Sequence, residues 1–234
     1  MFLKKKSLLD CGIFHGFTDY HSHLLYGVDD GVTVKEKSLE ILARMETLGV
    51  STIWLTPHIM EDIPNATQDL QNRYGELLQS YSGNIGLKLA AEYMLDLLFE
   101  ERLEKDDLLV MENRCLLVET SYFTPPSGLK DIFKRICAKG YFPLLAHPER
   151  YLYMQEQEYA SLKNLGVRFQ LNLPSLAGRY GGEVEKKARL LLKRGWYDCV
   201  GTDLHALSLF DEVISRKVLV SGVWKKLLPI VKVG

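Results

Sequence analysis

The chain has few of the features that mark secreted, membrane-spanning or nucleic-acid-binding proteins. Only four of its 234 residues are cysteine, and they form no Cys-x-x-Cys pair, which predicts reduced thiols rather than a disulfide framework. No apolar run approaches the roughly 20 residues of a membrane-spanning helix, and the N-terminal segment is too short and polar for a signal peptide. We therefore expect a cytoplasmic protein with no membrane span.

An excess of charge of one sign is absent as well. The 29 basic and 30 acidic residues nearly cancel, so the chain has no electrostatic basis for binding nucleic acid, and we expect no such partner. There is no glycine-rich nucleotide loop of the P-loop type. No cysteine is followed six residues later by arginine, which excludes phosphatase chemistry based on a cysteine nucleophile in a phosphate-cradling loop.

What the chain does contain is a series of short apolar runs that alternate with longer amphipathic segments. Nearly half of the residues are apolar, enough for the core of one domain over residues 1–234. The alternation favours parallel β/α units, so we predict an α/β fold, a distorted TIM-like (β/α)7 barrel with its site at the C-terminal ends of the strands. The expected strands are Phe17–His21, Val50–Leu55, Leu87–Ala91, Cys115–Val118, Phe142–Ala146, Val167–Leu173 and Tyr197–Gly201.

The segments between these runs have the end signals of helices. Thr33 and Glu36 have the spacing of a capping box, and Gly49 follows the apolar face of the helix that they begin. The other predicted helices cover Ala66–Ser82, Ser127–Lys139, Glu156–Leu165 and Glu183–Arg194.

Histidine and acidic residues recur where the apolar runs end. His21 and His23 lie two apart on a strand and so share one face, and Asp203 and His205 repeat this arrangement at the last strand. Imidazole and carboxylate groups together bind divalent metals. One such histidine alone would be better explained as a buried core residue, but six of the seven runs end in this way. The pattern predicts a metal site, with further ligands at His58, Glu92, Glu119 and His147.

The loop after His23 contains two adjacent candidates, Asp29 and Asp30. Either carboxylate could bind metal while the other caps the turn, which Gly31 favours at this point. The residues themselves leave this choice open.

These residues stand in motifs that resemble the polymerase-and-histidinol-phosphatase (PHP) superfamily over about residues 17 to 206. Within it, the chain is most similar to the bacterial manganese-dependent tyrosine-protein phosphatases of capsule and exopolysaccharide synthesis. The motifs are His21-Ser22-His23, Val28-Asp29-Asp30-Gly31, Thr56-Pro57-His58, Ala91-Glu92-Tyr93, Val118-Glu119-Thr120, His147-Pro148-Glu149-Arg150 and Gly201-Thr202-Asp203-Leu204-His205.

The resemblance implies a site for two or three divalent ions, manganese first, with iron and zinc as alternatives. In this arrangement Glu92 bridges two of the ions. The implied ligand sets are His21, His23, Glu92 and Asp203; Glu92, Glu119 and His147; and Asp30, His58 and His205.

The charge balance of such a site supports a phosphate ester as the substrate. Four carboxylates and three divalent ions leave a net charge of +2, which suits a phosphomonoester. We expect a metal-bridging hydroxide to attack phosphorus, with no protein nucleophile. Arg150 would bind the phosphoryl oxygens through its planar fork of donors. The alternative for Arg150 is a structural ion pair with Glu149 or another acid.

Members of the family often carry an arginine shortly after the final Asp-x-His, whereas here the next one is Arg216. Arg179, in a glycine-rich segment, is a candidate replacement; a plain surface loop explains it equally well. The resemblance further implies a phosphotyrosine protein as partner, namely the C-terminal tail of a membrane-associated tyrosine kinase, and it is compatible with an oligomer.

Two alternatives to a protein-tyrosine phosphatase remain open at this stage. One is a small-molecule phosphatase of the same superfamily, for example one acting on histidinol phosphate. The other is a non-catalytic metal-binding regulatory module, against which the complete ligand set argues. The ligand types alone also allow a metal-dependent amidohydrolase, which would usually need a carboxylated lysine or a single general base among the ligands; no lysine ends a strand. The loops at residues 59–66 and 122–127 would decide whether the mouth admits a peptide.

Overall fold

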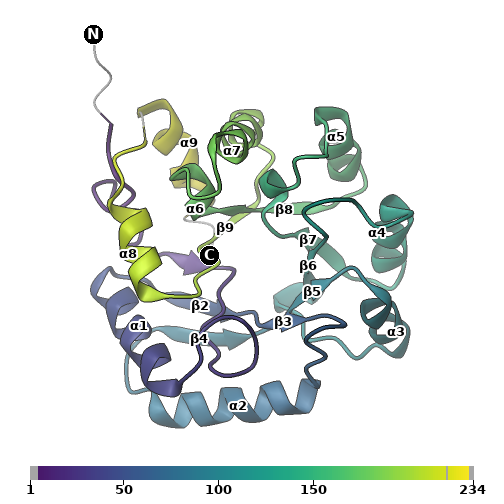
Figure 1. Ribbon diagram of the computed structural model, residues 1–234, viewed down its shortest axis with the longest axis horizontal. Coiled ribbons are helices and arrows are strands. Elements are labelled where there is room, and N and C mark those ends of the chain that lie inside the picture. The colour runs from purple at the N-terminus through teal and green to yellow at the C-terminus, as the bar shows by residue number, and fades with distance from the viewer. Residues whose placement is uncertain (1–4, 220, 232–234) are drawn as a thin grey trace.

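In this computed structural model the strands form two sheets, each of parallel strands, within an outer ring of helices (Figure 1). The structure describes residues 5–219 and 221–231. In the three-stranded sheet the order is β1 (Thr18–Asp19), β2 (Thr52–Leu55) and β4 (Gly86–Leu89). In the six-stranded sheet the order is β3 (His58–Ile59), β5 (Glu92–Met94), β6 (Cys115–Glu119), β7 (Phe142–Leu145), β8 (Arg168–Asn172) and β9 (Cys199–Gly201).

Each of the seven predicted runs contains a strand, but the sheets together form a half-barrel rather than one continuous (β/α)7 ladder. Strand β2 ends before β3, and strand β4 ends before β5. The segments β3 and β5 then belong to the six-stranded sheet rather than to the three-stranded one. Pro57, which lies between β2 and β3, has no N–H to donate to a ladder. The edges of the two sheets meet where the Tyr20 amide donates to the Val200 carbonyl at 3.1 Å.

All five predicted helices are present, and the structure adds four that the sequence analysis did not include. The predicted ones are α1 (Lys35–Thr47), α2 (Thr67–Ser80), α4 (Leu129–Ala138), α5 (Glu156–Asn164) and α7 (Gly182–Arg194). The added ones are α3 (Leu97–Lys105), α6 (Leu173–Leu176), α8 (Leu207–Ser215) and α9 (Ser221–Val231). Short 3-10 turns cover Glu112–Arg114 and Pro148–Arg150. Within the described ranges, no helix has the length and apolar character to cross a membrane.

The predicted capping box at Thr33 is wrong. The residue before the first turn of α1 is Val34, which is extended and has no capping side chain. The helix therefore starts later than expected, and its stability comes from the buried face of Ile41, Leu42 and Met45 rather than from its N-terminus.

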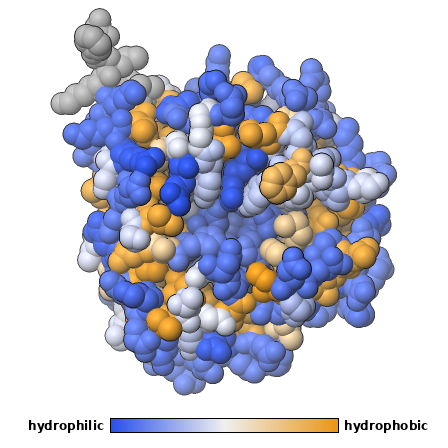
Figure 2. Space-filling model, viewed as in Figure 1, coloured by the Kyte–Doolittle hydropathy of each residue, from blue (hydrophilic) through white to orange (hydrophobic). Residues whose placement is uncertain are grey.

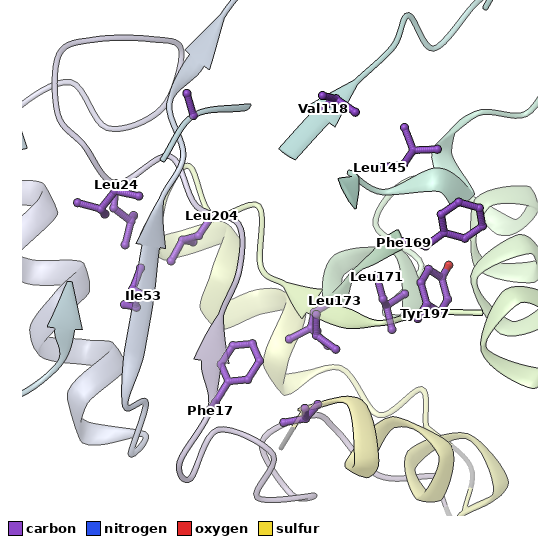
Figure 3. Packing of buried hydrophobic residues seen from close by; sticks show 14 of the residues in the cluster. Phe17, Leu24, Ile53, Val118, Leu145, Phe169, Leu171, Leu173, Tyr197 and Leu204 are labelled. Atoms are coloured by element: carbon purple, nitrogen blue, oxygen red, sulfur yellow. The ribbon is translucent and has the colours of Figure 1, made fainter. Parts of the chain in front are cut away.

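The main core lies between the strands and the helices that cover them. Phe17, Ile53 and Leu145 are fully buried there (Figure 3). A smaller apolar cluster, which includes Trp54 and Leu144, is separate from this core. Close packing of both fixes the strands against one another, and so fixes the positions of the side chains at their C-terminal ends.

Candidate metal centre

The nine predicted ligands converge on one cluster, mostly from residues that end or follow strands. His21 and His23 directly follow β1, His58 begins β3, Glu92 begins β5, and Glu119 ends β6. His147 follows β7, and Asp203 and His205 follow β9. The side chains of His21, His23 and Glu92 are completely buried. In Figure 2, hydrophilic residues line the hollow at the centre of the face shown.

Glu92 lies at the centre of the cluster. Its Oε2 is 3.0 Å from His21 Nε2 and 3.2 Å from His58 Nδ1, and its Oε1 is 3.0 Å from His147 Nε2. Glu119 approaches the same groups, with Oε1 at 3.2 Å from His58 Nδ1 and Oε2 at 3.8 Å from His147 Nε2. Two carboxylates and three imidazoles thus meet within the reach of shared ions.

Asp203 closes the cluster from the opposite edge. Its Oδ1 is 3.4 Å from His23 Nε2 and 3.6 Å from His21 Nε2. Its backbone has φ of 52°, in the left-handed region, and its amide donates to the His21 carbonyl at 2.8 Å. This uncommon conformation at the end of β9 directs the carboxylate back towards the two histidines.

Asp30 and Asp29, which the sequence left as alternatives, have different surroundings. Asp30 is the outer group: its Oδ1 is 3.6 Å from His58 Nε2 and 3.5 Å from His205 Nε2, and its side chain is 65% exposed. The hydrogen bond with His205 lowers the pKa of Asp30 to about 2. Asp30 therefore stays ionised and borders the open side of the cluster.

Asp29, in contrast, supports the cluster from behind. Its Oδ2 accepts hydrogen bonds from His23 Nδ1 at 2.8 Å and from the His58 amide at 3.1 Å. Its Oδ1 accepts from the Gly31 amide at 2.9 Å. A carboxylate that receives the Nδ1–H of an imidazole leaves Nε2 free as a metal ligand.

The donor atoms suit a set of neighbouring divalent ions. Three groups each have ligand atoms within 4.8 Å of one another: His21–His23–Glu92, His58–Glu92–Glu119 and His23–Asp30–His58–His205. Within the described chain, His58 Nδ1 is buried and has no hydrogen-bond partner, although two carboxylate oxygens lie nearby. An imidazole nitrogen in that position fits coordination better than protein hydrogen bonding.

The electrostatics of the metal-free chain also favour cations. Burial alone would lower the pKa of His21, but the Glu92 and Asp203 carboxylates outweigh it and raise that pKa to about 9. Burial likewise opposes the charge of His23, yet the hydrogen bonds that its imidazole donates to Asp203 and Asp29 keep its pKa well above the ordinary value. The acids thus bind positive charge strongly, whether as protons or as metal ions.

Strand β8 supplies supporting residues that the sequence analysis missed. Gln170 Oε1 lies 3.0 Å from His21 Nδ1 and accepts the His147 amide at 3.2 Å. Asn172 Nδ2 donates to Asp203 Oδ2 at 2.8 Å. Its run, Val167–Leu173, is the one that ends without a histidine or an acidic residue, and the placing of Gln170 and Asn172 on one face is the signal that could have found them.

A cavity opens beside the ligand cluster, and Arg150 lies in its wall. Its Nη1 donates to Asp203 Oδ2 at 3.0 Å, so its acidic partner is a predicted metal ligand and not the neighbouring Glu149. The fully buried Glu149 instead accepts the Asn172 amide and the Tyr197 hydroxyl. The cavity has a volume of about 440 Å³, and the exposed Arg179 also lines it.

Comparison with known proteins identifies the family of the chain. Residues 17–210 match the family described as capsular polysaccharide synthesis, CpsB/CapC. The chain belongs to this family. It is 30% identical to the tyrosine-protein phosphatase CpsB of Streptococcus pneumoniae over 205 residues, which cover 81% of the chain and 83% of that protein. It is 26% identical to the tyrosine-protein phosphatase YwqE of Bacillus subtilis, over 80% of the chain and 76% of YwqE.

Solved structures agree on the fold. One match comes from the crystal structures of YwqE from Bacillus subtilis and CpsB from Streptococcus pneumoniae, which are described as metal-dependent tyrosine phosphatases. The matched chain superposes on this one with a TM-score of 0.73 and shares 23% of its sequence. That match covers 92% of this chain and 87% of the other. A lactonase from Listeria monocytogenes matches more distantly, with a TM-score of 0.53 over 97% of this chain and 90% of the lactonase. The architecture around the cluster is therefore that of a CpsB-like fold.

Proposed function

We propose that this protein is a metal-dependent phosphomonoester hydrolase that dephosphorylates phosphotyrosine in a protein. The observation that carries the proposal is the convergence of imidazole and carboxylate donors into three adjoining groups around Glu92. Membership of the CpsB/CapC family supports it, because curated relatives are named tyrosine-protein phosphatases.

The ions would be held by the nine residues that the sequence analysis selected, with Asp29, Gln170 and Asn172 as their supports. We favour two or three manganese ions, with iron and zinc as alternatives. When bound, such ions supply a Lewis acid for the phosphoryl oxygens and activate water as the nucleophile. The ligands are His21, His23, Asp30, His58, Glu92, Glu119, His147, Asp203 and His205.

The chain's own contribution to catalysis is to orient and bind the phosphoryl group. Asp203 Oδ2 engages one edge of Arg150, and the cavity borders the guanidinium group. Planar donors there can stabilise the charge that spreads over the phosphoryl oxygens in the transition state. The exposed Arg179 lies on the same cavity wall and would attract the substrate electrostatically.

The aromatic surface beside the cavity supports a peptide as the substrate. The ring of Tyr122 lines the cavity, and the adjacent Phe123 is 88% exposed. Exposed aromatic side chains of this kind are typical of recognition surfaces. As the substrate we propose the C-terminal tail of a membrane-associated tyrosine kinase. The four free cysteines are compatible with the cytoplasmic location that we propose for the protein.

A paired assay tests this proposal. Purified, manganese-loaded protein is given a phosphotyrosine peptide and, separately, histidinol phosphate. We expect turnover of the peptide and little of the small alcohol ester. The matched control is His23→Ala, which removes one ligand and should lose more than about 100-fold in kcat. Full activity of this variant would refute the mechanism, and preference for histidinol phosphate would refute the substrate class.

A further inference from the structure

Two tyrosine rings flank Arg150 at the edge of the proposed metal centre. The guanidinium carbon lies 4.1 Å from the ring centroid of Tyr122 and 4.3 Å from that of Tyr180. Tyr122 comes from the loop after β6, whereas Tyr180 comes from the segment between α6 and α7. Two separate loops thus contact the same cation, and each contact is a cation–π interaction of good geometry.

Among the described residues, Asp203 is the one hydrogen-bond partner of the Arg150 side chain. Its two neighbouring rings cover the planar group, and Nη1 is engaged by Asp203. The Arg150 side chain is nevertheless 19% exposed, and it lines the cavity. Because an arginine side chain has five N–H donors in a fixed fork, the unengaged ones can serve an incoming anion.

Each tyrosine is also tied to a carboxylate of the proposed metal centre. The Tyr180 hydroxyl donates a long hydrogen bond to Asp203 Oδ2 at 3.4 Å, and the Tyr122 hydroxyl donates one to Glu119 Oε2 at 3.3 Å. The rings are therefore positioned relative to the same groups that would hold the ions.

The loop of Tyr180 is shaped for this contact. Gly178 and Gly181 have φ of 74° and 91°, conformations that other residues adopt only with strain. They bracket Arg179 and Tyr180 and allow the chain to turn back over the cavity. The conformation brings the Tyr180 ring onto Arg150 and leaves the Arg179 side chain exposed.

We propose that Tyr122 and Tyr180 are positioning residues that hold Arg150 as a preoriented receptor for the phosphoryl group. Their rings fix the plane of the guanidinium group, while their hydroxyls make only long hydrogen bonds to the carboxylates of the metal centre. This inference rests on the proposed phosphatase function for its kinetic part. Its binding part stands alone, because inorganic phosphate tests the arginine without any turnover.

The experiment compares ring removal with hydroxyl removal. Tyr180→Leu and Tyr122→Leu abolish the cation–π contact, whereas Tyr180→Phe and Tyr122→Phe keep it. The affinity of the manganese-loaded protein for inorganic phosphate is measured by calorimetry, together with kcat and KM for a phosphotyrosine peptide. Each leucine variant should weaken phosphate binding about tenfold, and each phenylalanine variant should stay within about threefold of the parent. Tyr153→Leu, which removes a ring that stacks on Tyr151, is the control and should bind phosphate normally.

A double-mutant cycle decides whether the rings act through Arg150. In an Arg150→Gln background, Tyr180→Leu should have no further effect on phosphate affinity. Manganese content and thermal unfolding, measured on every variant, show whether the fold and metal centre are intact. An equal loss of affinity with and without Arg150, or unchanged affinity in a leucine variant that is folded and metal-loaded, would overturn the proposal. If the parent protein binds phosphate through Arg150 but hydrolyses no phosphotyrosine peptide, the proposed function fails while the positioning role stands.

Discussion

Asp29 and Asp30 are adjacent acids in one loop, yet the structure gives them separate tasks. Asp29 is held by the His23 imidazole and two backbone amides, whereas Asp30 reaches outwards to His58 and His205. The sequence could limit the choice to these two residues. It could not make the choice, because the direction of each side chain depends on how the loop packs against β3.

A substitution at Asp29 tests whether a residue outside the ligand set orients a ligand, here the His23 imidazole. In Asp29→Asn the side chain keeps its size but loses the charge that orients the His23 imidazole. We expect manganese affinity to fall by about 10- to 100-fold, with little change in thermal stability of the metal-free protein. Isothermal titration measures the affinity. Unaltered affinity would show that His23 needs no such partner.

The raised pKa of His21 makes a second prediction at this scale. Its pKa is raised to about 9 by Glu92 and Asp203 against the effect of burial, so the metal-free protein holds a proton there at pH 7. A metal ion must displace that proton, so binding should release about one proton or more and strengthen as pH rises from 6 towards 9. Calorimetry in buffers of different ionisation enthalpy counts the protons. Binding that is independent of buffer and pH contradicts this expectation.

At the scale of elements, the strands were more predictable than their ends. All seven predicted runs overlap a strand, because short runs rich in apolar residues are typical of buried parallel strands. The breaks after β2 and β4 were not predicted, since they depend on how the ladder passes from one sheet to the other around Pro57. Helix α8 was missed although its buried face includes Phe210, Val213 and Ile214.

The loop after β1 can be tested through its glycine. A Cβ at Gly31 would lie 2.3 Å from the His23 carbonyl oxygen, which is backbone and cannot move away cheaply. Gly31→Ala should therefore destabilise the fold by about 1–3 kcal/mol and weaken manganese binding. The matched control is Gly75→Ala in α2, where a Cβ meets nothing within 4 Å; it should stabilise the fold by about 0.5–1 kcal/mol. Denaturant unfolding measures both, and equal effects of the two substitutions would contradict the close approach.

At the scale of the whole molecule, the proposed ions join both sheets. Glu92 and His58 lie in the six-stranded sheet, and His21 follows a strand of the three-stranded one. Chelation should consequently destabilise the entire domain. At a free metal concentration of 100 times Kd the loss is about 2.7 kcal/mol, or roughly 5–10 °C in Tm for a chain of this size. Differential scanning calorimetry with and without chelator measures it, and His23→Ala should show a smaller difference.

The family could be identified and a candidate ligand set selected from the sequence because the motifs fall at the ends of recognisable strands. The supports from β8 and the two tyrosines beside Arg150 could not, since glutamine, asparagine and tyrosine are common in all parts of a protein. Their roles become visible only when distant segments are brought within contact distance, as with Tyr122, Arg150 and Tyr180.

The most direct measurement titrates metal-free protein with manganese while following both bound metal and the hydrolysis of a phosphotyrosine peptide. We expect activity to be absent at first, to rise in step with bound manganese and to level off at about two to three ions per chain. Hydrolysis that proceeds at full rate in the chelated protein, or saturation of the site without any hydrolysis, would contradict it.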